Sequence, residues 1–75
     1  MEIELKNKIA EVLEVDASIL TNSKVLDELE AWDSVTMLGL VVILSDDLGE
    51  PVNPGEIGQF KTFGDIVMFV SKNKL

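Results

Sequence analysis

Residues 34–48 read SVTMLGLVVILSDDL, and they form the most apolar segment of this 75-residue chain. The segment contains no proline, and apolar residues would lie on nearly every side of the helix that it forms. A helix that is apolar all round is usually buried by its neighbours. The sequence therefore predicts a central helix over residues 34–48 that the rest of the chain largely covers.

The residues that follow carry signals for the end of one helix and the start of another. Gly49 is a common C-terminal stop, and Pro51 disfavours continuation of the helix. Asn53 and Pro54 predict a new start, with Asn as the N-cap and Pro at the first helical position. We expect a short helix that ends near Phe60.

The last helix is predicted from a capping pattern followed by an apolar stripe. Thr62-Phe63-Gly64-Asp65 is similar to a capping box with Asp in place of Glu. Helical spacing of apolar residues continues after it, at Phe63, Ile66, Val67 and Val70.

The N-terminal half of the chain predicts one helix and one long connection. Apolar residues follow helical spacing from Glu4 to Glu14, and charged residues fill the opposite face. Residues 16–33 form a long connection between the first and second helices. Its apolar residues can pack onto a core, and a short helical turn could form near Leu26.

These segments together predict the fold class. We expect an all-α protein, a small antiparallel four-helix bundle with three main helices, one short helix and a long loop between the first and second. The length of 75 residues suits a single domain over residues 1–75.

The composition excludes several kinds of site. The chain has no Cys and no His, which excludes disulfides and thiolate metal sites and removes the commonest zinc ligand and general base. We expect no metal site. The apolar runs are far shorter than the ~20 residues of a membrane span, and the start lacks the pattern of a secretory signal, so we expect a cytoplasmic protein.

Negative charge is concentrated in the middle of the chain. The net charge is −8, and residues 25–60 contain no Lys or Arg but have these acids: Asp27, Glu28, Glu30, Asp33, Asp46, Asp47, Glu50 and Glu56. Such a segment repels nucleic acid and anionic lipid and attracts basic protein partners. A solvated acidic face is the alternative. We expect a monomer that binds neither nucleic acid nor membrane.

Ser34 lies at the border between the acidic connection and the apolar segment. Asp33 and Ser34 are both good N-cap residues, so the pair could serve only to begin a helix. A nucleophilic serine needs a base, and this chain contains no His. A third possibility is that another enzyme modifies Ser34, because a phosphate is favoured at a helix N-terminus.

The order of these features resembles the acyl carrier proteins over nearly the whole chain. The resemblance rests on an amphipathic first helix and on four short motifs: Leu13-Glu14-Val15, Leu26-Asp27-Glu28-Leu29, Asp33-Ser34-Val35 and Asp46-Asp47-Leu48. It implies that Ser34 carries 4′-phosphopantetheine, transferred from coenzyme A by a separate magnesium-dependent phosphopantetheinyl transferase. The serine would be a substrate, so we expect no enzymatic activity.

The resemblance also implies residues that bind partners. Asp33, beside the modified serine, would engage basic residues of the transferase and of acyl-loading and acyl-processing enzymes. Val35, Val42 and Val52 match recognition positions of the family, although each could equally be core, and Asp46 lies at the far end of the same helix. Trp32 could either plug the loop onto the bundle or stand exposed as an anchor for a partner.

The predicted second helix departs from the family at three positions. Thr36, Gly39 and Ser45 stand where acids are common in fatty-acid carriers. We therefore expect a free-standing carrier that holds acyl thioesters for a specialised lipid or secondary-metabolite pathway. The alternatives are an aminoacyl or peptidyl carrier and an unmodified acidic helical adaptor.

Overall fold

Helix α2 (Ser34–Leu48) is the central element of the computed structural model, which describes residues 1–73. Its bounds are those that the sequence predicts. The other elements, in chain order, are α1 (Ile3–Leu13), the 3₁₀ turns η1 (Ala17–Ile19) and η2 (Leu26–Glu28), α3 (Pro54–Ile57) and α4 (Phe63–Asn73). The structure thus confirms an all-α bundle of three main helices and one short helix.

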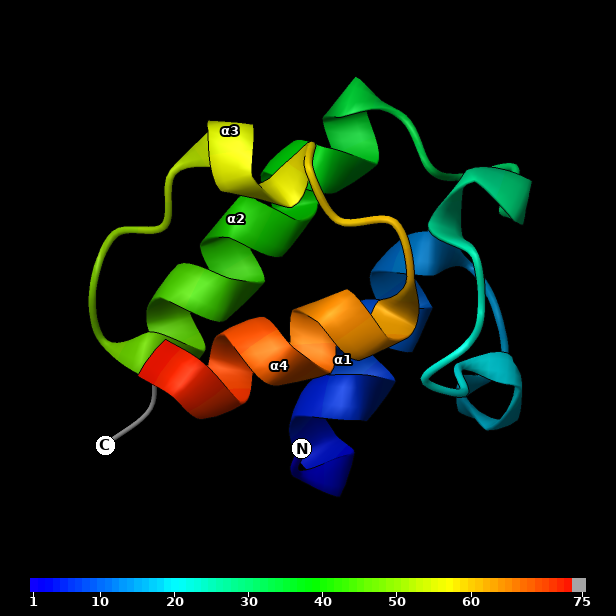
Figure 1. Cartoon of the computed structure of the whole chain (residues 1–75), viewed down its shortest axis with the longest axis horizontal. Helices are drawn as coiled ribbons and strands as arrows, with labels where there is room; N and C mark the ends of the chain where they lie inside the picture. Colours follow the sequence, from blue (N-terminus) through cyan, green and yellow to red (C-terminus); the bar gives the residue numbers. More distant parts are fainter. Residues whose placement is uncertain (74–75) are drawn as a thin grey trace.

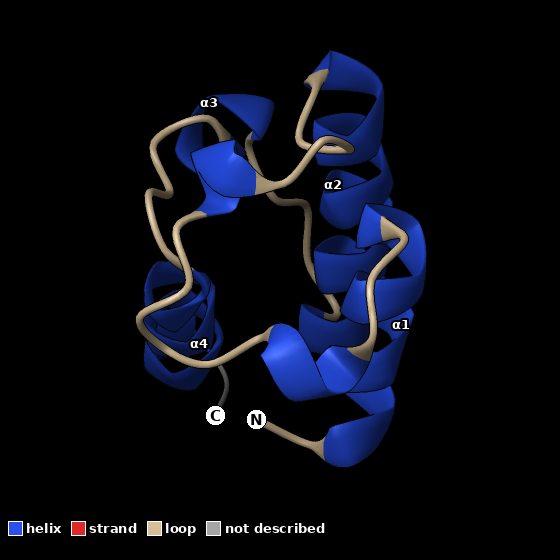
Figure 2. Cartoon of the chain, turned by 90° about the vertical axis from the view of Figure 1, so that its right-hand side faces the viewer, coloured by secondary structure: helices blue, strands red, loops and turns tan. Residues whose placement is uncertain are grey.

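The four helices form two groups around one core. Helices α1 and α2 lie side by side and run in opposite directions (Figures 1 and 2). Helices α3 and α4 both lie on one side of this pair, as Figure 2 shows. The core between them is apolar and consists of Leu5, Ile9, Ala10, Leu13, Leu20, Leu26, Leu29, Leu40, Leu44, Val52, Ile57, Phe63, Ile66 and Val70.

Helix α2 is much less covered than the sequence suggests. Only three of its residues, Thr36, Leu40 and Leu44, are buried. Three others have highly exposed side chains: Val35 (76%), Leu38 (57%) and Val42 (68%). The expectation of a largely buried helix is therefore wrong. The neighbours α1, α3 and α4 leave one face of α2 open to solvent, because so short a chain has too few elements to surround it.

Local signals set the helix ends almost as expected. Gly49 ends α2 in the left-handed conformation, with φ 73°. The Asn53 side chain accepts a hydrogen bond from the Gly55 N–H at 2.8 Å, which caps α3. This helix ends at Ile57, earlier than predicted, because Gly58 already acts as its C-cap.

The predicted capping box of α4 is present. The Asp65 N–H donates to the Thr62 hydroxyl at 3.3 Å, and the Asp65 carboxylate accepts the N–H groups of Lys61 and Thr62 at 2.8 and 3.1 Å. These bonds satisfy groups that would otherwise be orphaned at the helix start.

The long connection between α1 and α2 is fastened to the start of α4. The Leu26 N–H donates to the Lys61 carbonyl, and the Phe63 N–H to the Lys24 carbonyl, each at 2.9 Å. The Gly64 N–H donates to the Asn22 carbonyl at 2.9 Å. We call these three bonds the loop strap. These bonds order the connection that leads to Ser34. They join residues that are far apart in the chain, so local sequence patterns do not predict them.

The loop strap requires glycine at position 64, and this requirement is testable. A Cβ atom at Gly64 would lie 2.7 Å from the Asn22 carbonyl oxygen, closer than real contacts allow. We expect Gly64→Ala to lower the free energy of unfolding by about 1–3 kcal/mol, because backbone must move to admit the methyl group. Urea denaturation followed by circular dichroism measures this change.

Gly58→Ala is the matched control. A Cβ atom there meets only the Gly55 carbonyl oxygen, at 3.8 Å, and the backbone at Gly58 is right-handed helical. We expect this variant to be unchanged or stabilised by up to ~1 kcal/mol. Equal stability of the two variants would show that the close approach at Gly64 is not a constraint.

Candidate functional site

Ser34 is the first residue of α2, and its hydroxyl is open to solvent. Asp33 is the N-cap, and its carboxylate accepts the Thr36 N–H at 2.8 Å. The Asp33 carbonyl accepts the Met37 N–H at 2.9 Å, which begins the helical hydrogen-bond series. Ser34 is exposed, and within residues 1–73 its hydroxyl makes no hydrogen bond. Asp33 therefore caps α2, and the Ser34 oxygen has no hydrogen-bond partner among residues 1–73.

Asp33 places a fixed negative charge beside this hydroxyl. Hydrogen bonds from Thr36 hold the pKa of the Asp33 carboxyl below its ordinary value. The bond from the Thr36 backbone N–H has the larger effect, and the Thr36 side chain adds to it. The group is consequently ionised at neutral pH and exposed to any approaching protein. A basic partner surface would meet this charge next to Ser34.

The surroundings of Ser34 fit an attached phosphodiester. The N-terminus of a helix of this length favours negative charge through its macrodipole and its first N–H groups. The first turn of α2 contains no acidic residue, and within this helix start the negative charge is that of the Asp33 cap. The hydroxyl faces solvent, where a bulky group does not disturb the core.

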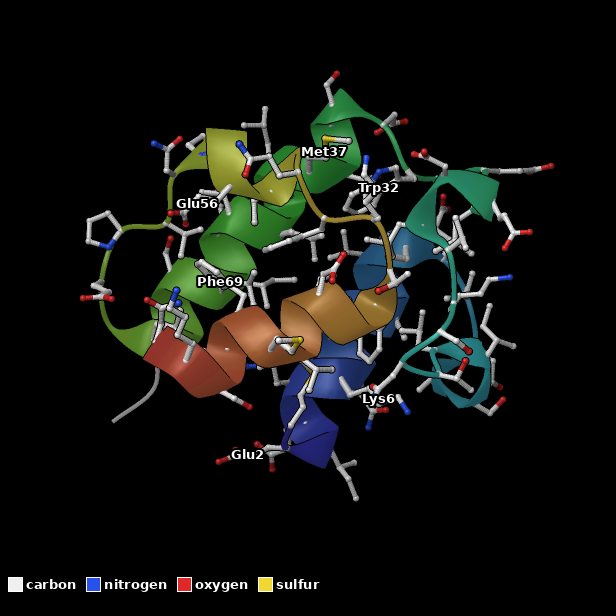
Figure 3. All side chains as sticks on the ribbon, in the orientation of Figure 1. Glu2, Lys6, Trp32, Met37, Glu56 and Phe69 are labelled. Atoms are coloured by element: carbon white, nitrogen blue, oxygen red, sulfur yellow. The ribbon has the colours of Figure 1, made fainter. Side chains whose placement is uncertain are left out.

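Ser34 lies apart from two hollows formed by residues 1–73. One hollow of about 420 Å³ lies between α3 and α4, and Figure 3 shows Glu56 and Phe69 at its two sides. A second, of about 280 Å³, is lined by the end of α1 and by residues 28–31. Ser34 lines neither hollow. Enzyme active sites usually lie in concave pockets, so this exposed position suits a residue that is acted upon.

Two of the predicted partner-binding valines lie on an open surface. Val35 and Val42 are exposed, and Leu38, which the sequence analysis missed, lies between them. These residues are three and four positions apart, so they share one helix face. We call them the α2 stripe. Asp33 and Asp46 are also exposed, one at each end of α2. Helical spacing alone places Leu38 on the same face as Val35 and Val42. Its exposure was not predicted because α2 was expected to be covered on all sides.

Val52 is different, because its side chain is 6% exposed and belongs to the core. A partner cannot reach it in this structure, so its predicted role in partner binding does not fit. The alternative interpretation, core packing, is the one that the structure supports. Val52 also lies in a fixed loop, since its N–H donates to the Ser45 hydroxyl at 3.0 Å.

The three positions that lack acids have structural roles. Thr36 is buried, with 9% of its side chain exposed, and Ser45 accepts the Val52 bond. Gly39 lies against α1, where a Cβ atom would be 3.2 Å from a Val12 methyl group. These positions therefore do not form an open docking face, and their lack of charge follows from packing. The absence of acids at Thr36, Gly39 and Ser45 therefore no longer indicates a specialised partner.

Trp32 is half-buried and packs against the core. Figure 3 shows it beside the start of α2, where the long connection meets the bundle. Of the two roles considered for it, the plug fits better.

The cap at Asp33 gives a testable pH dependence. Its folded-state pKa is lowered, so its contribution to stability is present above the unfolded pKa and is lost as pH falls through the folded value. In Asp33→Asn the amide oxygen can still cap but does not titrate near pH 4. We expect the wild type to lose more stability than this variant between pH 6 and about pH 3. Urea denaturation at both pH values measures the difference.

Asp16 and Asp65 also have lowered pKa values, and both are retained in the two proteins compared. Their acid response therefore cancels in the comparison. If wild type and Asp33→Asn lose the same stability on acidification, the Asp33 carboxylate is not held by the α2 N-terminus as described.

The described residues also bear on membranes and metals. Among residues 1–73, no helix is both long enough and apolar enough to cross a membrane. In the same range, no group of three or more potential metal-ligating side chains comes together.

Comparison of the sequence with known proteins shows the family of this chain. The family described as "Phosphopantetheine attachment site" matches residues 4–70. An acyl carrier protein of Lactobacillus acidophilus is 31% identical over 71 residues, which cover 93% of this chain and 88% of the relative. An acyl carrier protein of Thermotoga maritima is 35% identical over 69 residues, covering 91% and 84%. The matches span all four helices, and the chain therefore belongs to the acyl carrier protein family, whose members carry covalently attached 4′-phosphopantetheine.

Proposed function

We propose that this protein is a free-standing acyl carrier that holds acyl intermediates as thioesters on a 4′-phosphopantetheine arm attached to Ser34. The observation that carries the proposal is the exposed Ser34 hydroxyl, which makes no hydrogen bond within residues 1–73 because Asp33 caps the helix instead. The match to the attachment-site family covers this position.

The chemistry of attachment assigns a simple role to the chain. The Ser34 oxygen forms a bond to phosphorus of coenzyme A, the phosphoanhydride bond breaks, and 3′,5′-ADP leaves with the electron pair. The serine proton passes to a base of the transferase, since this chain has no His to accept it. When bound, the arm supplies a terminal thiol, which this Cys-free chain lacks. Ser34 is thus a substrate, and the proposal includes no catalysis by the chain itself.

Partners would dock on the outer face of α2. The α2 stripe offers exposed apolar surface, and Asp33 and Asp46 stand at its two ends, about 20 Å apart along a helix that rises 1.5 Å per residue. A matching partner has an apolar patch with basic residues on either side of it. The transferase and the acyl-loading and acyl-processing enzymes would share this mode.

The proposal also covers the pathway, the cellular compartment and the oligomeric state of the protein. Between Asp33 and Asp46 the open face of α2 presents apolar side chains and no acid, which favours enzymes that depend on apolar contact. The proposal keeps a dedicated pathway for a specialised lipid or secondary metabolite, although Thr36, Gly39 and Ser45 no longer argue for it. We include in the proposal that the carrier is a cytoplasmic monomer, and light scattering after size-exclusion chromatography measures its oligomeric state.

Replacement of the serine tests the site of attachment. We expect the wild type to gain one phosphopantetheine group when incubated with coenzyme A, Mg²⁺ and a broad-specificity transferase. Ser34→Ala should gain none, yet keep its helical circular dichroism, because Asp33 still caps α2. Intact-mass spectrometry measures the modification.

Ser71→Ala is the control, since Ser71 is an exposed serine of α4. This variant should be modified as fully as the wild type. Attachment to Ser34→Ala at another serine would reject the assignment. Absence of modification from the wild type would reject the carrier function and favour the unmodified adaptor.

The docking face is tested by shortening two residues of the α2 stripe. In Leu38→Ala/Val42→Ala, we expect the KM of the transferase for the carrier to rise about 5-fold or more, as loss of interface anchors does. The melting temperature should change little, because both side chains are mostly exposed. Steady-state kinetics with the carrier as varied substrate measure the KM.

Ile3→Ala/Met68→Ala removes two apolar side chains from α1 and α4 that are more exposed than Leu38 and Val42. This control should keep the wild-type KM. If both double variants raise the KM equally, exposed apolar area in general is responsible, and the α2 stripe is not the docking face.

A further inference from the structure

The segment that leads to Ser34 touches the core through few side chains. Leu29 and Thr36 bound this segment, with side chains 8% and 9% exposed. Between them, Glu30, Asp33, Ser34 and Val35 are exposed. Trp32 is the residue of 30–35 whose side chain packs against the buried core. It therefore connects the border of α2 to the bundle at the point where the chain turns into the helix.

The backbone of this segment has only local support before the helix begins. The Trp32 N–H donates to the Leu29 carbonyl at 3.1 Å, and the Asp33 N–H donates to the Ala31 carbonyl at 2.9 Å. The loop strap acts earlier in the chain, at residues 22–26. Bonds between near neighbours define a turn but do not fix where that turn lies relative to the bundle. The Trp32 side chain supplies this tertiary contact (Figure 3).

Tryptophan is well suited to this task. A large ring buries much apolar area while losing freedom about only two side-chain bonds. Asp33 follows Trp32 directly and Ser34 is two residues away, so a fixed ring limits the positions that both can adopt. The cap formed by Asp33 fixes α2 internally, and the Trp32 contact fixes the approach to it.

We propose that Trp32 is a positioning residue for the modification of Ser34, holding the turn so that the serine and its acidic neighbour are presented in one geometry to the transferase. This inference rests on the proposed function. When the binding-competent conformation is only partly populated, apparent affinity falls in proportion to that fraction. Trp32 would therefore act on recognition of the carrier, and the chemical step within the bound complex would be unaffected.

The test combines transferase kinetics with amide hydrogen exchange of the free carrier. In Trp32→Ala we expect the KM for the carrier to rise about 3- to 10-fold, with kcat unchanged, since the competent fraction falls. The amides of Asp33, Ser34 and Val35 should exchange faster than in the wild type. In Trp32→Phe a smaller ring still packs on the core, so KM and exchange should both return most of the way to wild-type values.

Val67→Ala is the control for general loss of stability. Val67 is also half-buried and packs against the core, but it lies on α4. We expect a lowered melting temperature with unchanged KM and unchanged exchange at residues 33–35. If Trp32→Ala does not fold, Trp32→Leu replaces it, and intermediate increases in both KM and exchange are expected.

Three results would overturn the inference. One is an unchanged KM in the folded Trp32 variant, and another is an equal rise in Val67→Ala. The third is a raised KM with unchanged amide exchange, which would make Trp32 a direct contact of the transferase. Failure of the proposed function is recognised separately, before any Trp32 variant is compared. In that case, peptide mapping of wild-type protein incubated with coenzyme A and the transferase finds no phosphopantetheine on Ser34.

Discussion

The hydrogen bond from the Thr36 N–H to the Asp33 carboxylate determines where α2 begins, and the arrangement around Ser34 depends on that register. If Ser34 were the N-cap, its hydroxyl oxygen would accept a backbone N–H of the first turn of α2. Asp33 would then lie one residue further from the start of the helix. With Asp33 as the cap, the serine becomes the first helical residue and its hydroxyl faces solvent. The same register turns Leu40 and Leu44 into the core and leaves Val35, Leu38 and Val42 outside. One short contact thus orients both the Ser34 hydroxyl and the surface next to it.

Features set by near neighbours in the chain could be predicted from the sequence. The bounds of α2, the Asn53 cap, the Thr62–Asp65 box and the stop at Gly49 all depend on residues within one helical turn. Ser34 and Asp33 were proposed as site residues because their place in a chain-long order of motifs resembles a family. Features that depend on packing could not be predicted in this way. An apolar helix composition does not say how many neighbours will cover the helix, so the exposure of Leu38 was missed and the burial of Val52 was left open.

Positions chosen by resemblance also need the structure before a role can be given to them. Thr36, Gly39 and Ser45 stood out as missing charges, yet each has a packing or hydrogen-bonding reason to be uncharged. An acid at Thr36 would place a charge in a nearly buried site, which is costly without a partner. The open positions of the helix are the ones beside them. The chemical character of the proposed docking surface is therefore set by the valines and leucine that face outward, with acids at the two ends of the helix.

The loop strap links residues that are far apart in the chain, and this has a consequence during synthesis. Asn22, Lys24 and Leu26 find their hydrogen-bond partners at residues 61–64, at the start of α4. A ribosome that has made only α1 and α2 has not yet supplied those partners, so the connection before Ser34 remains unfastened on the nascent chain. The strap forms only when most of the polypeptide has emerged. Under the proposed function, arm attachment would then favour chains in which α4 has been made over chains that lack it, and coenzyme A would not be consumed on the latter.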